Sequence, residues 1–160
     1  MKKVICFFIC VCFMMHSVVV FAEGNTDLGL NAKSAILMEE STGNILYESN
    51  PDERLPIASV TKVMTMLLIM EAVDSGKISL DDMVTVSTMF LETGEQLTVN
   101  DMLKGIAVAS ANDGCVAMAE HLAGSESAFV DMMNEKAAAI GCTNTHFTNP
   151  HGLHDENHYT

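Results

Sequence analysis

Apolar residues first gather in an almost unbroken run over residues 4–21, directly after Lys2 and Lys3. Ala22 ends the run with a small side chain, and polar residues follow. A basic start, an apolar stretch and a small residue at the cut are typical of a secretory signal peptide. We therefore expect residues 1–22 to be removed on export. The alternative is a retained membrane anchor, since the run reaches the lower length limit for a spanning helix.

The next pattern is that of a β-hairpin. A polar lead-in over residues 23–31 precedes two short runs rich in strand-forming residues, at 32–38 and 44–47. Gly43 and Asn44 between the runs are a turn signal. We expect the two runs to pair as antiparallel strands.

A longer pattern with helical spacing follows the connection at Pro56. Residues 59–73 repeat apolar side chains every three or four positions, and Gly76 ends the repeat. Residues 81–88 alternate instead, which predicts a short strand. The apolar face expected for the helix comprises Val63, Met66, Leu67 and Met70.

The second half of the chain predicts three helices. Thr98, with Asp101 three residues later, is a capping-box pattern that opens a helix through Val108. Residues 110–114 break the pattern before a second helix, which stops near Gly124.

The third helix begins at Ser125 or Ser127 and stops at Gly141. The remaining residues, 142–160, are polar and rich in histidine, and they show no helical or strand period. We therefore expect a loop at the end of the chain.

Charge and composition narrow the class of protein. The 160 residues carry 8 basic against 21 acidic side chains, a formal net charge of −13. A surface that binds nucleic acid needs clustered lysine and arginine, so this class of partner is excluded. Apolar residues make up 49% and charged residues 18% of the chain, which excludes a disordered protein. A chain of this length is one domain or part of one.

The cysteines do not indicate a disulfide scaffold. Three of the five fall in the expected signal peptide, so only Cys115 and Cys142 remain. Both lie in apolar helical patterns, where we expect buried free thiols. A bridge between the two is the alternative that an exported protein allows.

The first candidate for chemistry is Ser59-Val60-Thr61-Lys62, at the start of the apolar helix. One helical turn puts the Ser59 hydroxyl and the Lys62 amine on the same face. A serine hydroxyl needs an adjacent base to act as a nucleophile, and a lysine whose amine is held neutral can be that base. By itself, the tetrapeptide is better explained as a helix cap followed by a solvated lysine.

The second candidate is Ser110-Ala111-Asn112, in the break between two predicted helices. The hydroxyl can pass protons, and the amide can donate to and accept from a substrate peptide group. Taken alone, this tripeptide too is explained by helix capping. The order of the two motifs, their helical contexts and the export signal together favour a catalytic function.

Together these features resemble the N-terminal part of an exported serine-type D-alanyl-D-alanine carboxypeptidase, a low-molecular-mass penicillin-binding protein of peptidase family S11. Ser-x-x-Lys and Ser-x-Asn belong to the motif set of this wider class. The resemblance extends over residues 32–160. The matching segments are residues 35–38, 43–47, 56–65, 98–113 and 149–153, followed by His158 and Tyr159.

The resemblance implies an α+β fold of the β-lactamase/transpeptidase-like, penicillin-recognising type. In such a fold, an antiparallel sheet is covered by helices and joined to a helical lobe. Residues 32–50 would supply the first two strands, and residues 59–141 most of the helical lobe. Residues 32–160 would be a partial catalytic domain in the cell envelope, outside the cytoplasm, with no cofactor.

The family also implies a role for each motif residue. Ser59 would be the nucleophile that attacks the terminal D-Ala–D-Ala bond of a peptidoglycan stem peptide and forms an acyl-enzyme. Lys62 would be the general base, and Ser110 would relay a proton towards the leaving amine. Asn112 would bind the substrate amide and help to position Lys62. β-Lactams would inhibit the enzyme by acylating Ser59.

The sequence departs from the family pattern at two points. Ala111 stands where the family usually has glycine, which we expect to matter little. No Lys-Thr-Gly occurs in the 160 residues, although this third motif lies on a later strand of the family's sheet. We therefore expect a truncated piece of a longer protein that is inactive alone. Any membrane association would come from the missing C-terminal region.

Other readings of the motifs remain open. A class A β-lactamase shares the fold and the Ser-Lys chemistry, but its second motif is Ser-Asp-Asn. An exported sensor domain that has lost the chemistry is a further alternative. The histidines of the tail also suggest zinc, but their spacing on a loop defines no coordination geometry, so we expect no metal site. These histidines are His146, His151, His154 and His158.

Overall fold

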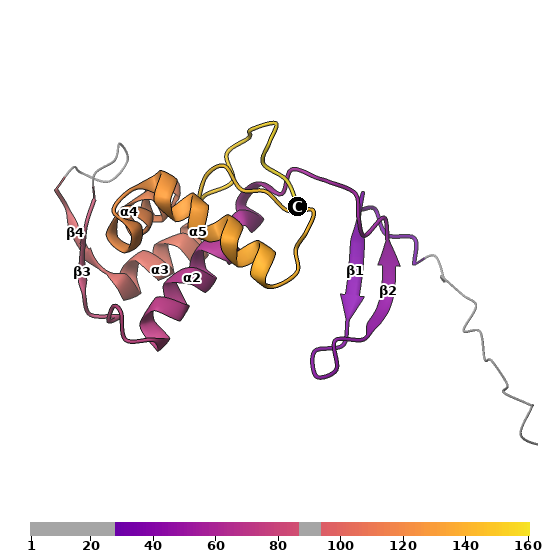
Figure 1. Ribbon diagram of the computed structural model, residues 1–160, viewed down its shortest axis with the longest axis horizontal. Helices are drawn as coiled ribbons and strands as arrows, with labels where there is room; N and C mark the ends of the chain where they lie inside the picture. The colour runs from indigo at the N-terminus through magenta and orange to yellow at the C-terminus, as the bar shows by residue number, and fades with distance from the viewer. Residues whose placement is uncertain (1–27, 87–93) are drawn as a thin grey trace, which may run out of the picture. The chain divides into compact units, whose positions relative to one another are not determined.

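The computed structural model describes residues 28–86 and 94–160. The predicted signal peptide therefore lies outside the described residues. The chain divides into two compact units, residues 1–51 and residues 52–160 (Figure 1).

The first unit contains the predicted hairpin. Strands β1 (Ala35–Met38) and β2 (Ile45–Ser49) pair antiparallel, with Ala35 opposite Ser49 and a shift in register between Leu37 and Met38. The hairpin expected from the sequence is thus confirmed, with the second strand two residues longer at its end.

A carboxylate organises the turn of this hairpin. The Glu39 side chain accepts hydrogen bonds from the backbone N–H groups of Ser41 and Thr42, at 3.1 and 2.8 Å, and from both hydroxyls. These bonds lower the pKa of Glu39 to about 2, and the bonds from the two hydroxyls have the largest effect. Gly43 closes the turn at a φ of +72°, a conformation that glycine adopts without steric cost.

The second unit is helical, with a small hairpin at one end (Figure 1). Strands β3 and β4 pair antiparallel, with Val84 opposite Leu97. The elements are the 3₁₀ turn η1 (Ala58–Thr61), α2 (Lys62–Asp74), β3 (Met83–Thr85), β4 (Gln96–Thr98), α3 (Val99–Ala109), α4 (Asn112–Ala123) and α5 (Glu126–Ala139).

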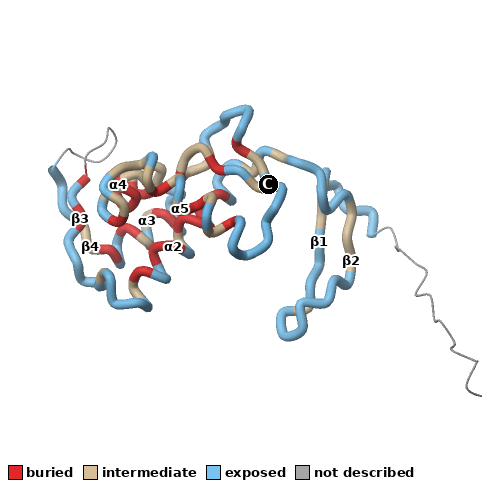
Figure 2. Tube along the Cα trace, viewed as in Figure 1, coloured by how far each residue is buried: buried red, intermediate tan, exposed pale blue. Residues whose placement is uncertain are grey.

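Helix α4 is the centre of this unit, because it packs against α2, α3 and α5. Figure 2 shows the buried positions gathered where these helices face one another. Each large apolar side chain in the core contributes about 1.5–3 kcal/mol through burial. The fully buried large apolar residues include Ile69, Ile106, Met118, Phe129 and Met133.

The helix ends follow the capping signals of the sequence. The Thr98 hydroxyl accepts a hydrogen bond from the Asp101 N–H at 3.1 Å and opens α3, as the capping-box pattern predicts. Ser125 caps α5 in the same way through the N–H of Ala128. Gly124 ends α4 in the left-handed conformation.

Three details differ from the sequence expectations. Ser59 lies in a 3₁₀ turn, and the α-helix begins only at Lys62. Strand β4 was not expected, because its three residues gain their structure from pairing with β3 rather than from a pattern of their own. On the expected apolar face of α2, Met66 packs against the core, whereas Val63 is 63% exposed.

Both cysteines of the described chain are free thiols, as expected. Cys115 is buried in α4, and burial raises its pKa to about 12, although the charge of Lys62 opposes this. The expectation of burial was wrong for Cys142, which is exposed because α5 has already ended before it.

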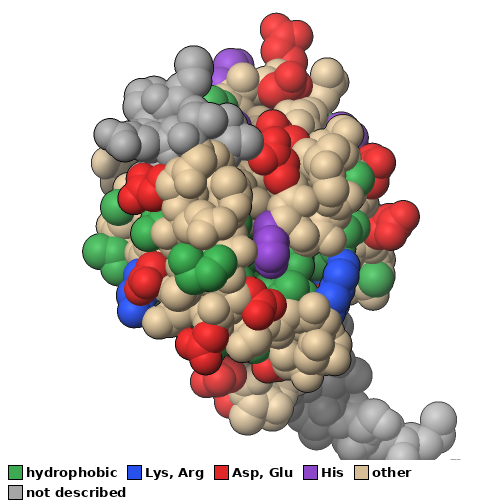
Figure 3. Space-filling model, turned by 90° about the vertical axis from the view of Figure 1, so that its left-hand side faces the viewer, with side chains coloured by type: hydrophobic (Ala, Val, Ile, Leu, Met, Phe, Trp, Pro, Cys, Tyr) green, Lys and Arg blue, Asp and Glu red, His purple; other side chains and the backbone are tan. Residues whose placement is uncertain are grey.

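The surface carries the acidic excess of the sequence. On the face drawn in Figure 3, aspartate and glutamate side chains are spread among polar and apolar ones and do not form a single patch. Within the described ranges, no helix is both long enough and apolar enough to cross a bilayer.

The cap of α3 gives a direct test of this local structure. Replacing Thr98 with alanine removes the acceptor for the Asp101 N–H and should lower the free energy of unfolding by about 1 kcal/mol. Thr98→Ser keeps the hydroxyl and should stay within a few tenths of a kcal/mol of wild type. Urea unfolding followed by circular dichroism measures both, and equal stabilities for the two variants would contradict the assignment of the cap.

Candidate active site

The two residues of the first motif lie one turn apart at the start of α2. Ser59 is exposed in η1, and the Lys62 side chain bends back so that Nζ donates to Ser59 Oγ at 3.1 Å. Lys62 is only 3% exposed. The spacing that the sequence suggested therefore does bring the hydroxyl and the amine together.

Two more oxygen atoms hold the amine of Lys62. Nζ donates to Asn112 Oδ1 and to the backbone oxygen of His151, both at 2.8 Å. Among the described residues, no carboxylate forms an ion pair with Lys62. All three partners of the amine are therefore uncharged.

The second motif reaches Ser59 from the junction of α3 and α4. Ser110 ends α3 in the left-handed conformation, at φ +54° and ψ +40°, and its hydroxyl donates to Ser59 Oγ at 3.0 Å. Asn112 is the first residue of α4. Hydrogen bonds thus join the four residues that the sequence motifs predict. These residues are Ser59, Lys62, Ser110 and Asn112.

The C-terminal loop also contacts these residues. Figure 1 shows it, in yellow, beside the turn that opens α2. Thr65 Oγ1 donates to the backbone oxygen of Pro150 at 2.6 Å, and the next carbonyl, that of His151, accepts from Lys62. The side chain of Asn149 holds the loop in shape by accepting from the N–H of Gly152 at 2.6 Å.

Gly152 allows the loop to approach η1, the turn that carries Ser59. A Cβ atom at this position would lie 1.8 Å from the backbone oxygen of Ala58 and 2.9 Å from Thr61 Oγ1. Only a residue without a side chain fits there. Sequence reasoning had noted this loop only as a matching segment and had not assigned the carbonyl of His151 to the site, since a backbone acceptor leaves no signature in residue types.

Two residues that lie close to Ser59 have a strained backbone. Ala58, directly before Ser59, has φ +47°, and Ser110 has φ +54°. Each such residue costs on the order of 1–3 kcal/mol and persists only where its surroundings fix it. Strain of this kind is typical of functional sites and here shapes the turns that carry Ser59 and Ser110.

Two histidines of the loop beside the site have lowered pKa values. Burial lowers the pKa of His151 below its ordinary 6.5, and the charges of Lys62 and His158 act in the same direction. Burial also lowers the pKa of His158, where Asp155 opposes the shift and His146 adds to it. Across the described parts of the chain, no three His, Cys, Asp or Glu side chains gather in a way that could hold a metal ion.

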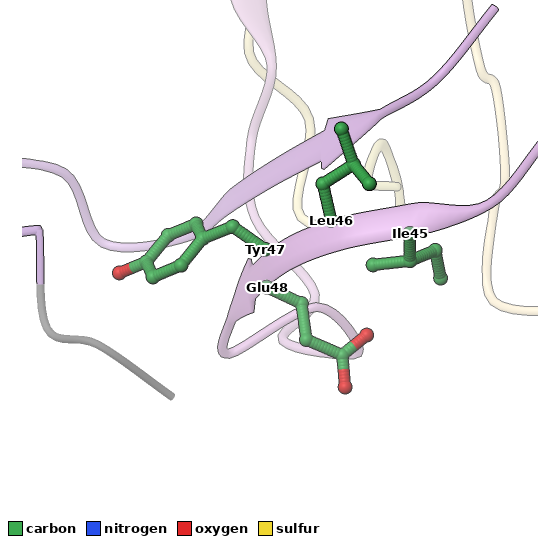
Figure 4. A pocket seen from close by; sticks show the side chains of 4 residues that line it. All are labelled: Ile45, Leu46, Tyr47 and Glu48. Atoms are coloured by element: carbon green, nitrogen blue, oxygen red, sulfur yellow. The ribbon is translucent and has the colours of Figure 1, made fainter. Parts of the chain in front are cut away.

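Two hollows in the surface do not contain the four motif residues. One, of about 240 Å³, is lined by four successive residues of β2, Ile45 to Glu48 (Figure 4). The other, of about 300 Å³, lies between Arg54 with Pro56 and the loop around Glu156. The residues that line the first hollow all lie on one strand, so this hollow brings together no groups from separate elements.

The fold of this chain is similar to that of solved penicillin-binding proteins. Penicillin binding protein 5 from Haemophilus influenzae superposes with a TM-score of 0.76 at 41% identity, over 81% of this chain and 41% of that one. Penicillin-Binding Protein D2 from Listeria monocytogenes, in its ampicillin-bound form, gives a TM-score of 0.73 at 29% identity, over 83% and 57%. The expected fold class is thereby confirmed, and the chain covers the N-terminal portion of it.

The family follows from the sequence matches. The profile of the S11 peptidases, described as D-alanyl-D-alanine carboxypeptidase, matches residues 21–160. D-alanyl-D-alanine carboxypeptidase DacF of Bacillus subtilis strain 168 is 54% identical over 144 residues, which are 84% of this chain and 37% of that protein. The chain therefore belongs to the S11 family of D-alanyl-D-alanine carboxypeptidases, and it spans about two fifths of the length of this relative.

The close approach of the loop predicts a large effect of one methyl group. Gly152→Ala should destabilise the fold by about 3 kcal/mol or more, because the new Cβ meets backbone as well as an unfavourable φ. Gly141→Ala is the matched control, since Gly141 has the same φ of +88° with nothing within 4 Å, and it should cost only about 1–2 kcal/mol. Urea unfolding measures both, and equal losses would refute the contact.

The lowered histidine pKa values predict a dependence of stability on pH. The unfolded chain takes up protons near pH 6.5, whereas the folded chain keeps His151 and His158 neutral to lower pH. The two histidines contribute fully to the free energy of unfolding above about pH 6.5. This contribution is lost as the pH falls through their lowered pKa values. The free energy of unfolding should therefore fall as the pH drops from about 6.5 towards the lowered pKa values of the two histidines.

Urea midpoints measured across this range test the pH prediction. His158→Gln removes one of the two titrating groups and should flatten the curve. A wild-type midpoint that does not change, or one that changes equally in His158→Gln, would contradict it.

Proposed function

We propose that this chain carries the N-terminal part of the catalytic domain of an exported serine D,D-carboxypeptidase. The substrate would be a peptidoglycan stem peptide that ends in D-Ala-D-Ala. The observation that carries the proposal is the meeting of Lys62 and Ser110 at Ser59 Oγ, at 3.1 and 3.0 Å. A nucleophile in contact with two groups able to move its proton is what acyl transfer through serine requires.

Lys62 is the general base in this proposal. As a free amine it has two N–H donors, which the oxygens of Asn112 and His151 take up at 2.8 Å each. The lone pair is then left facing the Ser59 hydroxyl. As the Ser59 oxygen attacks the carbonyl carbon of the penultimate D-alanine, its proton passes to Lys62 Nζ, and the same three oxygens accept the three protons of the resulting ammonium.

Ser110 completes the transfer. Its hydroxyl lies 3.0 Å from Ser59 Oγ, so it can give its proton to the leaving amine as the C–N bond breaks and D-alanine departs. In turn Ser110 takes a proton from the Lys62 ammonium, which returns to the free amine. The backbone N–H of Ser59 would supply one donor to the oxyanion, and Asn112 would bind the amide of the substrate. Water then attacks the ester and releases the shortened peptide and Ser59.

β-Lactams are proposed as inhibitors of the same site. The Listeria monocytogenes relative in the ampicillin-bound form has the same fold over 83% of this chain. A β-lactam would acylate Ser59 as a mimic of the D-Ala-D-Ala end.

The domain assignment is part of the proposal. Residues 1–22 would be the signal peptide, 23–31 a polar lead-in and 32–160 a partial catalytic domain on the outer side of the cytoplasmic membrane. The Lys-Thr-Gly motif, absent from these 160 residues, would lie downstream in the full-length gene product.

Substitution of the nucleophile tests the function. In the full-length gene product, Ser59→Ala should lower D-alanine release from a D-Ala-D-Ala peptide by about 10⁴-fold or more and abolish labelling by a fluorescent penicillin. Lys62→Ala should lower both rates by about 10²- to 10⁴-fold. Ser127→Ala and Lys104→Ala, both at exposed positions, are the matched controls and should behave as wild type.

The same assay distinguishes the alternatives. Sustained hydrolysis of penicillin without D-alanine release would indicate a β-lactamase. A stable adduct on Ser59, with neither hydrolysis of penicillin nor release of D-alanine, would indicate a sensor domain. Full D-alanine release by Ser59→Ala would refute the serine mechanism.

The isolated chain is expected to be inactive. Residues 1–160 include no Lys-Thr-Gly, so the part of the site that this motif supplies in the family would be missing. Intact-mass measurement after incubation with penicillin should therefore show no adduct on the 160-residue chain, while the full-length gene product is labelled. An adduct on Ser59 of the short chain would contradict this.

A further inference from the structure

His158 is a buried titratable residue that the proposed reaction does not use. Its ring is 3% exposed and makes an edge contact with Phe147, at 5.6 Å between ring centroids. Both ring nitrogens have partners. Nε2 lies 2.7 Å from Thr61 Oγ1, and Nδ1 lies 3.1 Å from the backbone N of Thr148.

These partners determine the tautomer. The N–H of Thr148 can only donate, so Nδ1 must be the acceptor and carry no proton. The proton of the neutral ring is therefore on Nε2, which donates to the hydroxyl of Thr61. The ring links the loop at Thr148 to the nucleophile turn at Thr61.

Thr61 is the second of the two residues between Ser59 and Lys62, the proposed nucleophile and its base. It is 1% exposed in η1 and directly precedes Lys62, so a bond to its hydroxyl fixes the turn that carries both reacting groups. The loop on the other side of the bond supplies the carbonyl of His151 to Lys62. A shift of His158 would therefore move the amine of Lys62 relative to one of its acceptors and to Ser59.

We infer that His158 is a positioning residue for the Ser59–Lys62 pair, acting through the Nε2–H···Oγ1 bond to Thr61. It contacts neither reacting atom, and its role is to hold η1 and the loop in a fixed position relative to each other. This inference rests on the proposed function, because that position affects the rate only if Ser59 is acylated. Misplacement of reacting groups by about 1 Å can cost on the order of 100-fold in rate.

Two pairs of variants separate the bonds of the ring. His158→Asn keeps an acceptor near Thr148 but loses the reach to Thr61, whereas His158→Gln keeps a donor near the position of Nε2. Thr61→Val keeps the shape of the side chain without the hydroxyl, whereas Thr61→Ser keeps the hydroxyl. Thr143→Val, at an exposed position before the loop, is the control.

The experiment uses the full-length gene product and measures acylation by a fluorescent penicillin, together with kcat and KM for release of D-alanine. His158→Asn and Thr61→Val should each lower the acylation rate and kcat by about 10- to 100-fold, with KM changed by less than about 3-fold. His158→Gln and Thr61→Ser should recover most of the rate. The double variant His158→Asn/Thr61→Val should be no slower than either single variant, because both substitutions remove the same hydrogen bond.

Several results would overturn the inference. If wild type is labelled and the two disrupting variants react at the wild-type rate, His158 has no positioning role. If the rates fall only in proportion to the folded fraction, measured by thermal melting, the two residues have only a structural role. If the losses of the two single variants multiply in the double variant, the two residues act independently. Absence of a wild-type adduct would refute the proposed function, and the inference with it.

A measurement on the unsubstituted protein guards against variants that fail to fold. Nitrogen-15 NMR of the imidazole rings should show His158 near neutral pH with a protonated Nε2 and an unprotonated Nδ1. A reversed tautomer would overturn the inference whatever the variants do.

Discussion

The site depends on how one buried amine is held. Lys62 Nζ is bonded to three uncharged oxygens that come from three parts of the chain: the turn before α2, the start of α4 and the C-terminal loop. A buried amine without acceptors would be strongly destabilising, so these contacts tie folding of the unit to assembly of the site. The same set of oxygens satisfies the amine with or without its third proton, which suits the general base that we propose at this position.

The backbone around this amine is strained, and the loop keeps it so. Ala58 and Ser110 both have positive φ, and each lies next to or within a motif. Gly152 lets the loop press against Ala58, while Thr65 and the ring of His158 tie the loop to α2 and to η1. At Ala58, a locally unfavourable conformation thus persists where a segment from the far end of the unit packs against it.

The helical unit supplies rigidity to this arrangement. Helix α4 is packed on three sides and begins at Asn112, so the amide that holds Lys62 is attached to the most enclosed element of the unit. Groups carried on packed helices hold their geometry better than groups carried on loops, and less reorganisation is then needed during reaction. The acidic surface takes no part in these contacts, because the site uses neutral acceptors.

The sequence alone determined the hairpin, the capped helices α3 and α5, and the four motif residues, because each leaves a local signal: a turn pair, a capping box, or a spacing of one helical turn. Only the tertiary structure decided that Ser59 lies in a 3₁₀ turn, that β4 exists and that Cys142 is exposed. It also decided that the carbonyl of His151 accepts from Lys62 and that the ring of His158 contacts Thr61. These features arise from contacts between residues far apart in the chain. A backbone carbonyl, which every residue has, becomes a ligand only when folding brings it within 2.8 Å of a buried amine.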